Sequence, residues 1–123
     1  MDKSEIIEVV QKYFDAGYDC NGELIKEIFH DDAHIYGHDE NNGLRNRDKE
    51  SFIKVVESGK TDGAEPDFPR QDEILSIEFT GENTAVAFVK IRIRNTMFTD
   101  ALSLIRLNGK WVIISKLFSG VPT

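Results

Sequence analysis

Residues 98–119 read FTDALSLIRLNGKWVIISKLFS, two alternating apolar runs on either side of Asn108-Gly109. An Asn-Gly pair in this setting is typical of a two-residue type I′ turn between antiparallel strands. The flanking runs, residues 97–107 and 110–118, are rich in the aliphatic and aromatic residues that strands favour. The stretch therefore predicts a β-hairpin.

The turn also predicts which residues oppose each other in the hairpin. Counting outward from it, Leu104 opposes Ile113 and Asp100 opposes Leu117. Side chains alternate between the two faces of a strand. Asp100 and Leu117 are therefore predicted to lie together on the apolar face.

Two earlier runs, residues 73–80 and 84–94, extend the predicted sheet to four antiparallel strands, with turns at residues 81–83 and 95–96. The predicted core face carries Ala87, Val89, Ile91, Ile93, Phe98, Asp100, Leu102, Leu104, Trp111, Ile113 and Leu117. The predicted outer face carries Phe88, Lys90, Arg92, Arg94, Thr99, Ser103, Ile105, Ile114, Lys116 and Phe118. Because the outer face mixes cations with large apolar side chains, we expect it to be partly buried in a homodimer.

The first half of the chain predicts three helices and one short strand. Residues 3–19 place their apolar side chains at helical spacing on one face. A second short helix follows, and a third runs from near Asp48 to Gly59. Residues 33–37 are predicted to form the strand. A loop is predicted at residues 60–70.

Composition bounds the class of protein. The 123 residues suit one domain of the α+β class, with three helices packed on a curved, mainly antiparallel sheet. A net charge of −7 makes nucleic acids and anionic membranes poor partners. The single cysteine, Cys20, excludes an intrachain disulfide, and no zinc spacing of cysteines exists. Without a signal-peptide pattern or an apolar run of ~18 residues, we expect a cytoplasmic protein.

The order of elements and one stretch resemble a known family. The stretch carries Thr99-Asp100, Leu102-Ser103-Leu104, Gly109-Lys110-Trp111 and Lys116. These residues resemble the group named "putative lumazine-binding". The whole chain resembles the NTF2-like superfamily, which includes ketosteroid isomerase, scytalone dehydratase and the SnoaL-like proteins. The resemblance implies a cone fold with a pocket between helices and concave sheet. The chain departs from the group at Ala101, where a Tyr or Phe is typical.

Asp100 is the leading candidate for chemistry. The predicted register places its carboxyl among apolar side chains, where burial raises a carboxyl pKa and favours a proton donor. The plainer alternative is a strand-start residue at the rim of the sheet, bonded to backbone or to a solvated cation. Tyr13 on the first helix, with Phe98 and Trp111 on the core face, are candidate ligand contacts. A core role is the preferred alternative for Tyr13 and Trp111.

Residues 29–39, FHDDAHIYGHD, contain all three histidines of the chain. His34 and His38 are four strand positions apart, about 13 Å, so they cannot share one metal ion unless the chain turns between them. We therefore predict no metal site and no cofactor. His34 or Tyr36 is a candidate general base or ligand contact, and His34 is the candidate partner of Asp100. A position on the surface or rim is the plainer alternative for both.

Three functions remain open at this point. The first is a small-molecule-binding protein whose ligand, a flat heterocycle or apolar ring, is oriented by Asp100 and Tyr13. The second is a cofactor-free isomerase, dehydratase or cyclase with His34 or Tyr36 as base and Asp100 as acid. The family resemblance places the base of ketosteroid isomerase at Gly37, which counts against steroid isomerisation. The third is a dimerisation module whose cavity is filled by side chains.

Overall fold

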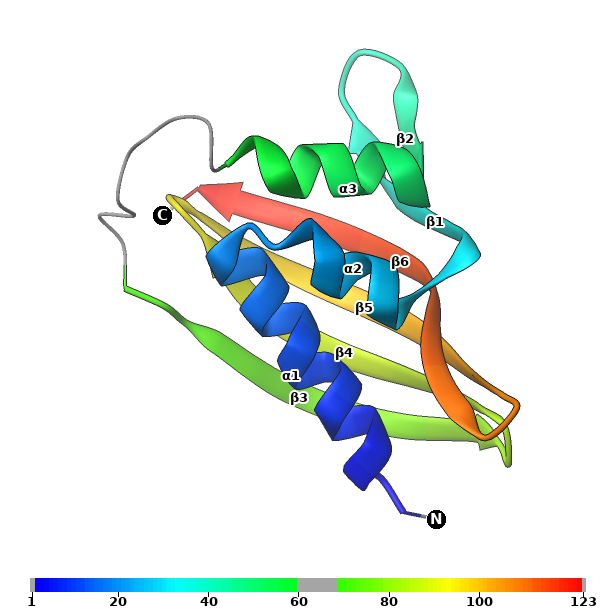
Figure 1. The fold of residues 1–123 in the computed structure, drawn as a ribbon. Coiled ribbons are helices and arrows are strands. Elements are labelled where there is room, and N and C mark those ends of the chain that lie inside the picture. Colours follow the sequence, from blue (N-terminus) through cyan, green and yellow to red (C-terminus); the bar gives the residue numbers. More distant parts are fainter. Residues whose placement is uncertain (1, 60–68, 123) are drawn as a thin grey trace.

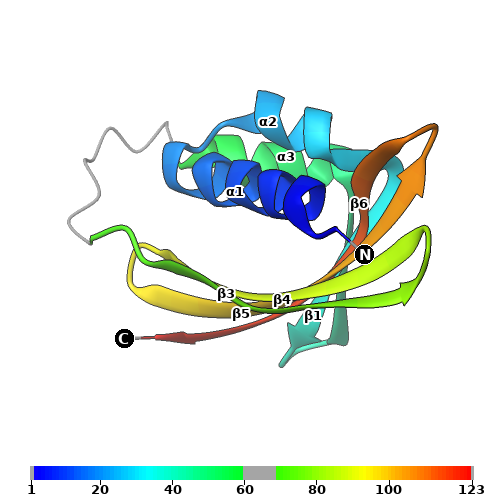
Figure 2. The same ribbon diagram turned by 90° about the horizontal axis from the view of Figure 1, so that it is seen from below.

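A computed structural model describes residues 2–59 and 69–122 of the chain. Its helices and strands are, in chain order, α1 (Ser4–Asp19), α2 (Gly22–Ile28), β1 (Phe29–Asp39), β2 (Gly43–Asp48), α3 (Lys49–Ser58), β3 (Asp72–Gly81), β4 (Thr84–Ile93), β5 (Thr96–Leu107) and β6 (Lys110–Pro122). The strands form one sheet in the order β2-β1-β6-β5-β4-β3, in which β1 and β6 pair in parallel and the other neighbours antiparallel. Figure 1 and Figure 2 show the helices packed together on the concave face of this curved sheet. The α+β architecture is confirmed, and most of the predicted loop at residues 60–70 lies outside the described residues.

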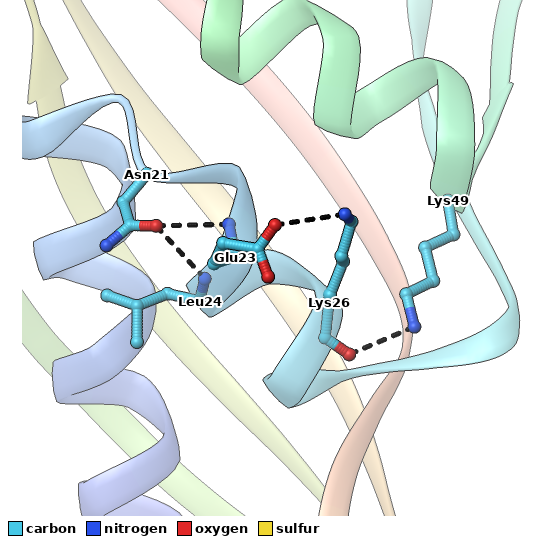
Figure 3. A network of polar contacts seen from close by, with 5 residues as sticks. All are labelled: Asn21, Glu23, Leu24, Lys26 and Lys49. Atoms are coloured by element: carbon cyan, nitrogen blue, oxygen red, sulfur yellow. Dashed lines mark hydrogen bonds and ion pairs between the residues drawn. The ribbon is translucent and has the colours of Figure 1, made fainter.

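The first two helices follow from the sequence pattern. The buried stripe of α1 consists of Ile6, Val10, Tyr13, Phe14 and Ala16. The helix ends at Cys20, which takes a left-handed φ of 53°. Asn21 then caps α2, and its side-chain oxygen accepts the backbone N–H groups of Glu23 at 3.0 Å and Leu24 at 3.3 Å (Figure 3). The reversal between α1 and α2 is therefore set by two adjacent residues.

Lys49, the first residue of α3, ties that helix to α2. Its ammonium donates to the backbone carbonyl of Lys26 at 3.0 Å and pairs with Asp31 at 2.9 Å. Figure 3 shows the contact with Lys26 beside the ion pair between Lys26 and Glu23. The end of α2 and the start of α3 are thereby held side by side over the sheet.

The free edge of the sheet differs from the prediction. β1 covers all of Phe29–Asp39 rather than residues 33–37, and the sequence pattern does not predict β2. β2 reads GLRNRD and is exposed along nearly all of its length, so it lacks the apolar alternation that signals a strand. Backbone pairing with β1, as between Ile35 and Arg47, forms this edge strand instead.

The hairpin predicted at Asn108-Gly109 is confirmed. Both residues have positive φ angles, 53° and 78°, as a type I′ turn requires. The pairing of Leu104 with Ile113 that this turn predicts is also present. The turn therefore sets the register of β5 and β6 for the residues nearest to it.

The turn between β4 and β5 falls one residue earlier than predicted, at residues 94–95. Ile93 pairs with Thr96, and Arg94 takes a left-handed φ of 55°. Val89 therefore opposes Asp100, whereas a two-residue turn at residues 95–96 would have placed Ile91 there. Because the register changes by two residues, the side chains within β4 and β5 keep their predicted faces. Arg94, predicted on the outer face, instead lies in the turn and lines the interior.

One extra residue in β6 changes the face that its second half presents. Leu104 pairs with Ile113, but the preceding residue, Ser103, pairs with Ser115. Ile114 is therefore the unpaired residue of a β-bulge. Beyond a bulge, side chains point to the face opposite to the one that simple alternation predicts.

Three predicted placements are wrong because of this bulge. Lys116, predicted on the outer face, faces the helices and is 8% exposed, whereas Leu117, predicted in the core, is 60% exposed. Phe118, also predicted on the outer face, pairs with Asp100 and lines the interior. The bulge thus brings a cation into the core in place of an apolar side chain.

Gly37 on β1 provides the space into which Phe118 of β6 packs. A Cβ atom at this position would lie 2.6 Å from Cζ of the Phe118 ring. We expect Gly37→Ala to lower the free energy of unfolding by about 1–3 kcal/mol, because overpacking displaces the ring or the backbone. Urea unfolding measures this loss. Gly81→Ala, whose Cβ would meet Thr84 Oγ1 at 3.1 Å, is the control, and equal losses in both variants would contradict the role of the Phe118 contact.

Candidate functional site

A cavity of about 340 Å³ lies between the concave face of the sheet and the helices. Its lining consists of Tyr13, Gly17, Cys20, Ile25, Ile35, Arg45, Arg47, Phe52, Val55, Val56, Ser58, Gly59, Ile91, Ile93, Arg94, Phe98, Lys116 and Phe118. Most of this surface is apolar, and every helix and the five strands β1, β2, β4, β5 and β6 contribute to it. The cavity therefore exists only in the folded chain, where these elements meet.

Three polar side chains from different elements meet at the inner wall of this cavity. The hydroxyl of Tyr13, on α1, donates to Oδ2 of Asp100, on β5, at 2.5 Å. The ammonium of Lys116, on β6, lies 3.9 Å from the same oxygen. Tyr13 and Lys116 line the cavity, and Asp100 is fully buried behind them.

Aromatic rings surround the ammonium of Lys116. Its Nζ lies 4.6 Å from the ring centroid of Phe52, 5.1 Å from that of Tyr13 and 5.4 Å from that of Phe118. A cation over the faces of aromatic rings is stabilised by their quadrupoles, more strongly where water is excluded. These rings offset part of the free energy that burying the ammonium costs.

Burial perturbs the pKa of all three groups. It raises the pKa of the Asp100 carboxyl, while the charge of Lys116 and the Tyr13 hydrogen bond oppose that rise. It lowers the pKa of the Lys116 ammonium, which the Asp100 charge opposes and the Arg47 charge reinforces. Burial and the neighbouring Asp100 hold the pKa of Tyr13 well above its usual value, so this hydroxyl stays a hydrogen-bond donor. Within the described part of the chain, the other carboxylate oxygen, Oδ1 of Asp100, has no hydrogen-bond partner.

The structure brings together some of the residues that the sequence singles out. Asp100 is fully buried on the core face, as predicted, and accepts a hydrogen bond from Tyr13. Phe98 lines the cavity and contacts the ring of Phe118 edge-on, with ring centroids 5.8 Å apart. These three predicted residues thus belong to one site.

The predicted bases on β1 point away from that site. Ala33, Ile35 and Gly37 face the interior, so the alternate residues, His34 and Tyr36, face the outside of the sheet. Nδ1 of His34 lies 2.7 Å from Oδ1 of an asparagine on β2. The imidazole ring of His34 stacks on the ring of Tyr36, with ring centroids 5.9 Å apart. The expected pairing of His34 with Asp100 is therefore corrected, because the two side chains lie on opposite faces of the sheet.

Trp111 is also separate from the cavity. It is 4% exposed and packs edge-on against Phe79, with ring centroids 6.0 Å apart. The guanidinium of Arg106 lies 5.6 Å from its ring centroid. Trp111 thus covers the hairpin end of the core. The expectation that Trp111 stacks on a ligand does not apply to this cavity, because Trp111 does not line it.

Two cationic residues of the cavity wall escape prediction from the sequence. Lys116 is placed on the wrong face because the bulge at Ile114 leaves no signal in the alternation of residues. Arg47 lies on β2, whose polar sequence does not predict a strand. A readable signal does exist for β1, where small and apolar residues alternate with His34, Tyr36 and His38.

The described residues contain no group of three or more His, Cys, Asp or Glu side chains placed to hold a metal ion. Among the helices described for residues 2–59 and 69–122, none is long and apolar enough to cross a membrane.

Comparison with known proteins identifies the family. The sequence profile of the family described as "Putative lumazine-binding" matches residues 1–119. The chain belongs to this family. Among curated proteins, none matches the chain.

Solved structures confirm the NTF2-like fold of this member of the family. An NTF2-like protein of unknown function from Shewanella baltica is 26% identical, with a TM-score of 0.84 over 98% of this chain and 94% of that chain. One from Methylobacillus flagellatus is 28% identical, with a TM-score of 0.74 over 96% and 90%. A ketosteroid isomerase-like protein from Erwinia carotovora atroseptica is 14% identical, with a TM-score of 0.73 over 98% and 96%, and shares the fold.

Removing the Tyr13 hydroxyl tests the polar centre, which is the cluster of Tyr13, Asp100 and Lys116 at the inner wall of the cavity. Tyr13→Phe leaves Oδ2 of Asp100 without its donor, so we expect it to lower the free energy of unfolding by about 1–3 kcal/mol. Because that hydrogen bond lowers the pKa of Asp100, its loss raises this pKa further. The ionised carboxylate is the form that needs the donor, so the destabilisation should grow as pH rises through the folded-state pKa of Asp100.

Urea unfolding at acidic and neutral pH, with carboxyl NMR titration of Asp100, measures both effects. Tyr18→Phe is the matched control, since Tyr18 is 41% exposed and near the end of the same helix. A loss from Tyr13→Phe that is independent of pH, or no larger than that from Tyr18→Phe, would contradict this role.

Proposed function

We propose that the protein binds a small molecule with a flat, apolar ring system, without transforming it. The observation that carries this proposal is the mostly apolar cavity of about 340 Å³, into which few polar groups project. Cavities of about 300–1,000 Å³ with this composition are those in which proteins bind small ligands. The name of the family refers to lumazine, a flat heterocycle, which supports a planar ligand.

The cavity wall offers both packing and orientation to such a ligand. The rings of Phe98 and Phe118 provide apolar surface against which a planar ring can pack. The hydroxyl of Tyr13 is occupied by Asp100, whereas the Lys116 ammonium is 3.9 Å from that carboxylate, beyond hydrogen-bond distance. Lys116 is therefore a polar group of the inner wall with donors available to a ligand.

The alternative functions receive less support from this geometry. An isomerase, dehydratase or cyclase needs a base facing its substrate. Among the described residues that line the cavity there is no carboxylate and no imidazole, and Gly37 stands where ketosteroid isomerase is expected to hold its base. A dimerisation module with a filled interior is disfavoured by the open volume of the cavity.

Binding of a neutral planar probe tests the proposal. We expect N-phenyl-1-naphthylamine to bind with an increase in fluorescence and to raise the melting temperature of the protein. Val56→Phe, which adds a ring to the cavity wall, should weaken binding about tenfold or more, because it occupies the space that the probe needs. Val9→Phe is the control, since Val9 on α1 does not line this cavity. Equal binding by both variants and the unaltered protein would contradict a site in the cavity.

We further infer that two copies associate through the outer face of the sheet. Strand pairing sets Phe88, Ala101, Leu117 and Tyr36 in one row across β4, β5, β6 and β1. Phe88 is 41% exposed and Leu117 is 60% exposed. A contiguous apolar row of this kind on a sheet is typical of an interface, and a second copy would present the same row in a two-fold pairing.

Leu117→Asp tests the dimer. Placing a charge in the row should convert a sedimenting dimer to a monomer, since a charge buried without a partner is costly in an interface. Ile7→Asp, on the exposed side of α1, is the control and should leave the dimer intact. A monomer for the unaltered protein, or a dimer for Leu117→Asp, would contradict this interface.

A further inference from the structure

Strand pairing places two cations next to each other on the inner wall of the cavity. Ile35 on β1 pairs with Arg47 on β2 on one side and with Lys116 on β6 on the other. The three side chains therefore form a row across the sheet, and all three line the cavity. With strands about 4.8 Å apart, the backbones of Arg47 and Lys116 are only about 10 Å from each other. Their long side chains can converge on one bound group.

Neither cation is fully paired in the protein alone. Arg47 is half-buried, and its guanidinium makes no hydrogen bond or ion pair with any residue that the structure describes. Lys116 is buried, and its one ionic neighbour, Asp100, lies at 3.9 Å. Fully buried cations are rare in proteins unless they are paired. Two such cations side by side repel each other, and an anion between them would remove that repulsion.

The rest of the cavity lining has the same sign of charge. Arg45, two residues before Arg47 on β2, and Arg94, in the turn between β4 and β5, also line it. Arg45 has a partner, Asp39 at 3.4 Å, and Arg94 donates to the carbonyl of Gly59 at 3.2 Å. No Asp or Glu is among the described residues of the lining, although the chain as a whole has a net charge of −7. Positive charge is therefore concentrated at the cavity in an otherwise acidic protein.

We propose that the ligand of this cavity is an organic anion, whose carboxylate, sulfonate or phosphate group binds between Arg47 and Lys116 while its planar apolar part packs against the rings of Phe98 and Phe118. This inference rests on the proposed function and adds the charge of the ligand to it. The guanidinium of Arg47 can offer two parallel N–H donors to an anionic group, and the compact ammonium of Lys116 adds a further donor. The apolar and cationic parts of the wall together set one orientation for the ligand.

Two fluorescent probes with the same ring skeleton test whether the cavity prefers a negatively charged ligand. N-phenyl-1-naphthylamine is neutral, and 8-anilino-1-naphthalenesulfonate is the same molecule with a sulfonate group. We expect Arg47→Gln to weaken binding of the sulfonate about tenfold more than binding of the neutral probe. Binding of the neutral probe also shows that the variant folds with an intact cavity. Arg47→Lys, which keeps the charge but not the paired donors, should lose less affinity for the sulfonate than Arg47→Gln.

Lys54→Gln is the matched control for the loss of one positive charge. Lys54 is exposed on α3 and does not line the cavity, so both probes should bind this variant as they bind the unaltered protein. The inference is overturned if Arg47→Gln changes the affinities of the two probes equally or changes neither, or if Lys54→Gln weakens sulfonate binding as much as Arg47→Gln does. A different result, in which the neutral probe fails to bind or binds equally to Val56→Phe, would overturn the proposed function itself.

Discussion

The contact between Lys116 and Asp100 is the interaction around which the interior of this protein is arranged. Both side chains are withdrawn from solvent, and Tyr13 donates to the same carboxylate oxygen that Lys116 approaches. Removing one partner from such a pair leaves a buried charge, which is strongly destabilising. A slip of β6 by one residue would return Lys116 to the outer face. The buried contact of Lys116 with Asp100 therefore forms in the register of β5 and β6 that includes the bulge at Ile114.

The same bulge determines the character of the cavity. It places Lys116 in a row with Ile35 and Arg47, so that cations occupy one part of a wall that is otherwise mostly apolar. It also turns Phe118 inward, over the space that Gly37 leaves open. One local irregularity in a strand thus supplies both a polar end and an aromatic surface, which is the combination that can orient a small ligand.

Much of the fold could be predicted because its signals are local. The Asn108-Gly109 turn, the amphipathic helix α1 and the alternation along β4 and β5 each depend on residues close together in the chain. β2 could not be predicted, since its polar residues form a strand by pairing their backbone with β1. The inward position of Lys116 could not be predicted either, because a bulge is decided by the pairing of two strands and not by the order of residues in one.

The sequence by itself determined the class of fold, the family and the face of the sheet on which Asp100 lies, since turn chemistry, apolar periodicity and a motif-bearing stretch are properties of short segments. The tertiary structure decided which side chains share the site. Tyr13 and Asp100 are 87 positions apart, and they meet because α1 packs on the concave face of the sheet. His34 and Tyr36, which have the chemistry of a base, are excluded from the cavity because Ala33, Ile35 and Gly37 occupy the inner face of β1. The residues of the candidate site are therefore those on the face of each strand that points toward the helices, and the pairing and packing of the strands determine which face that is.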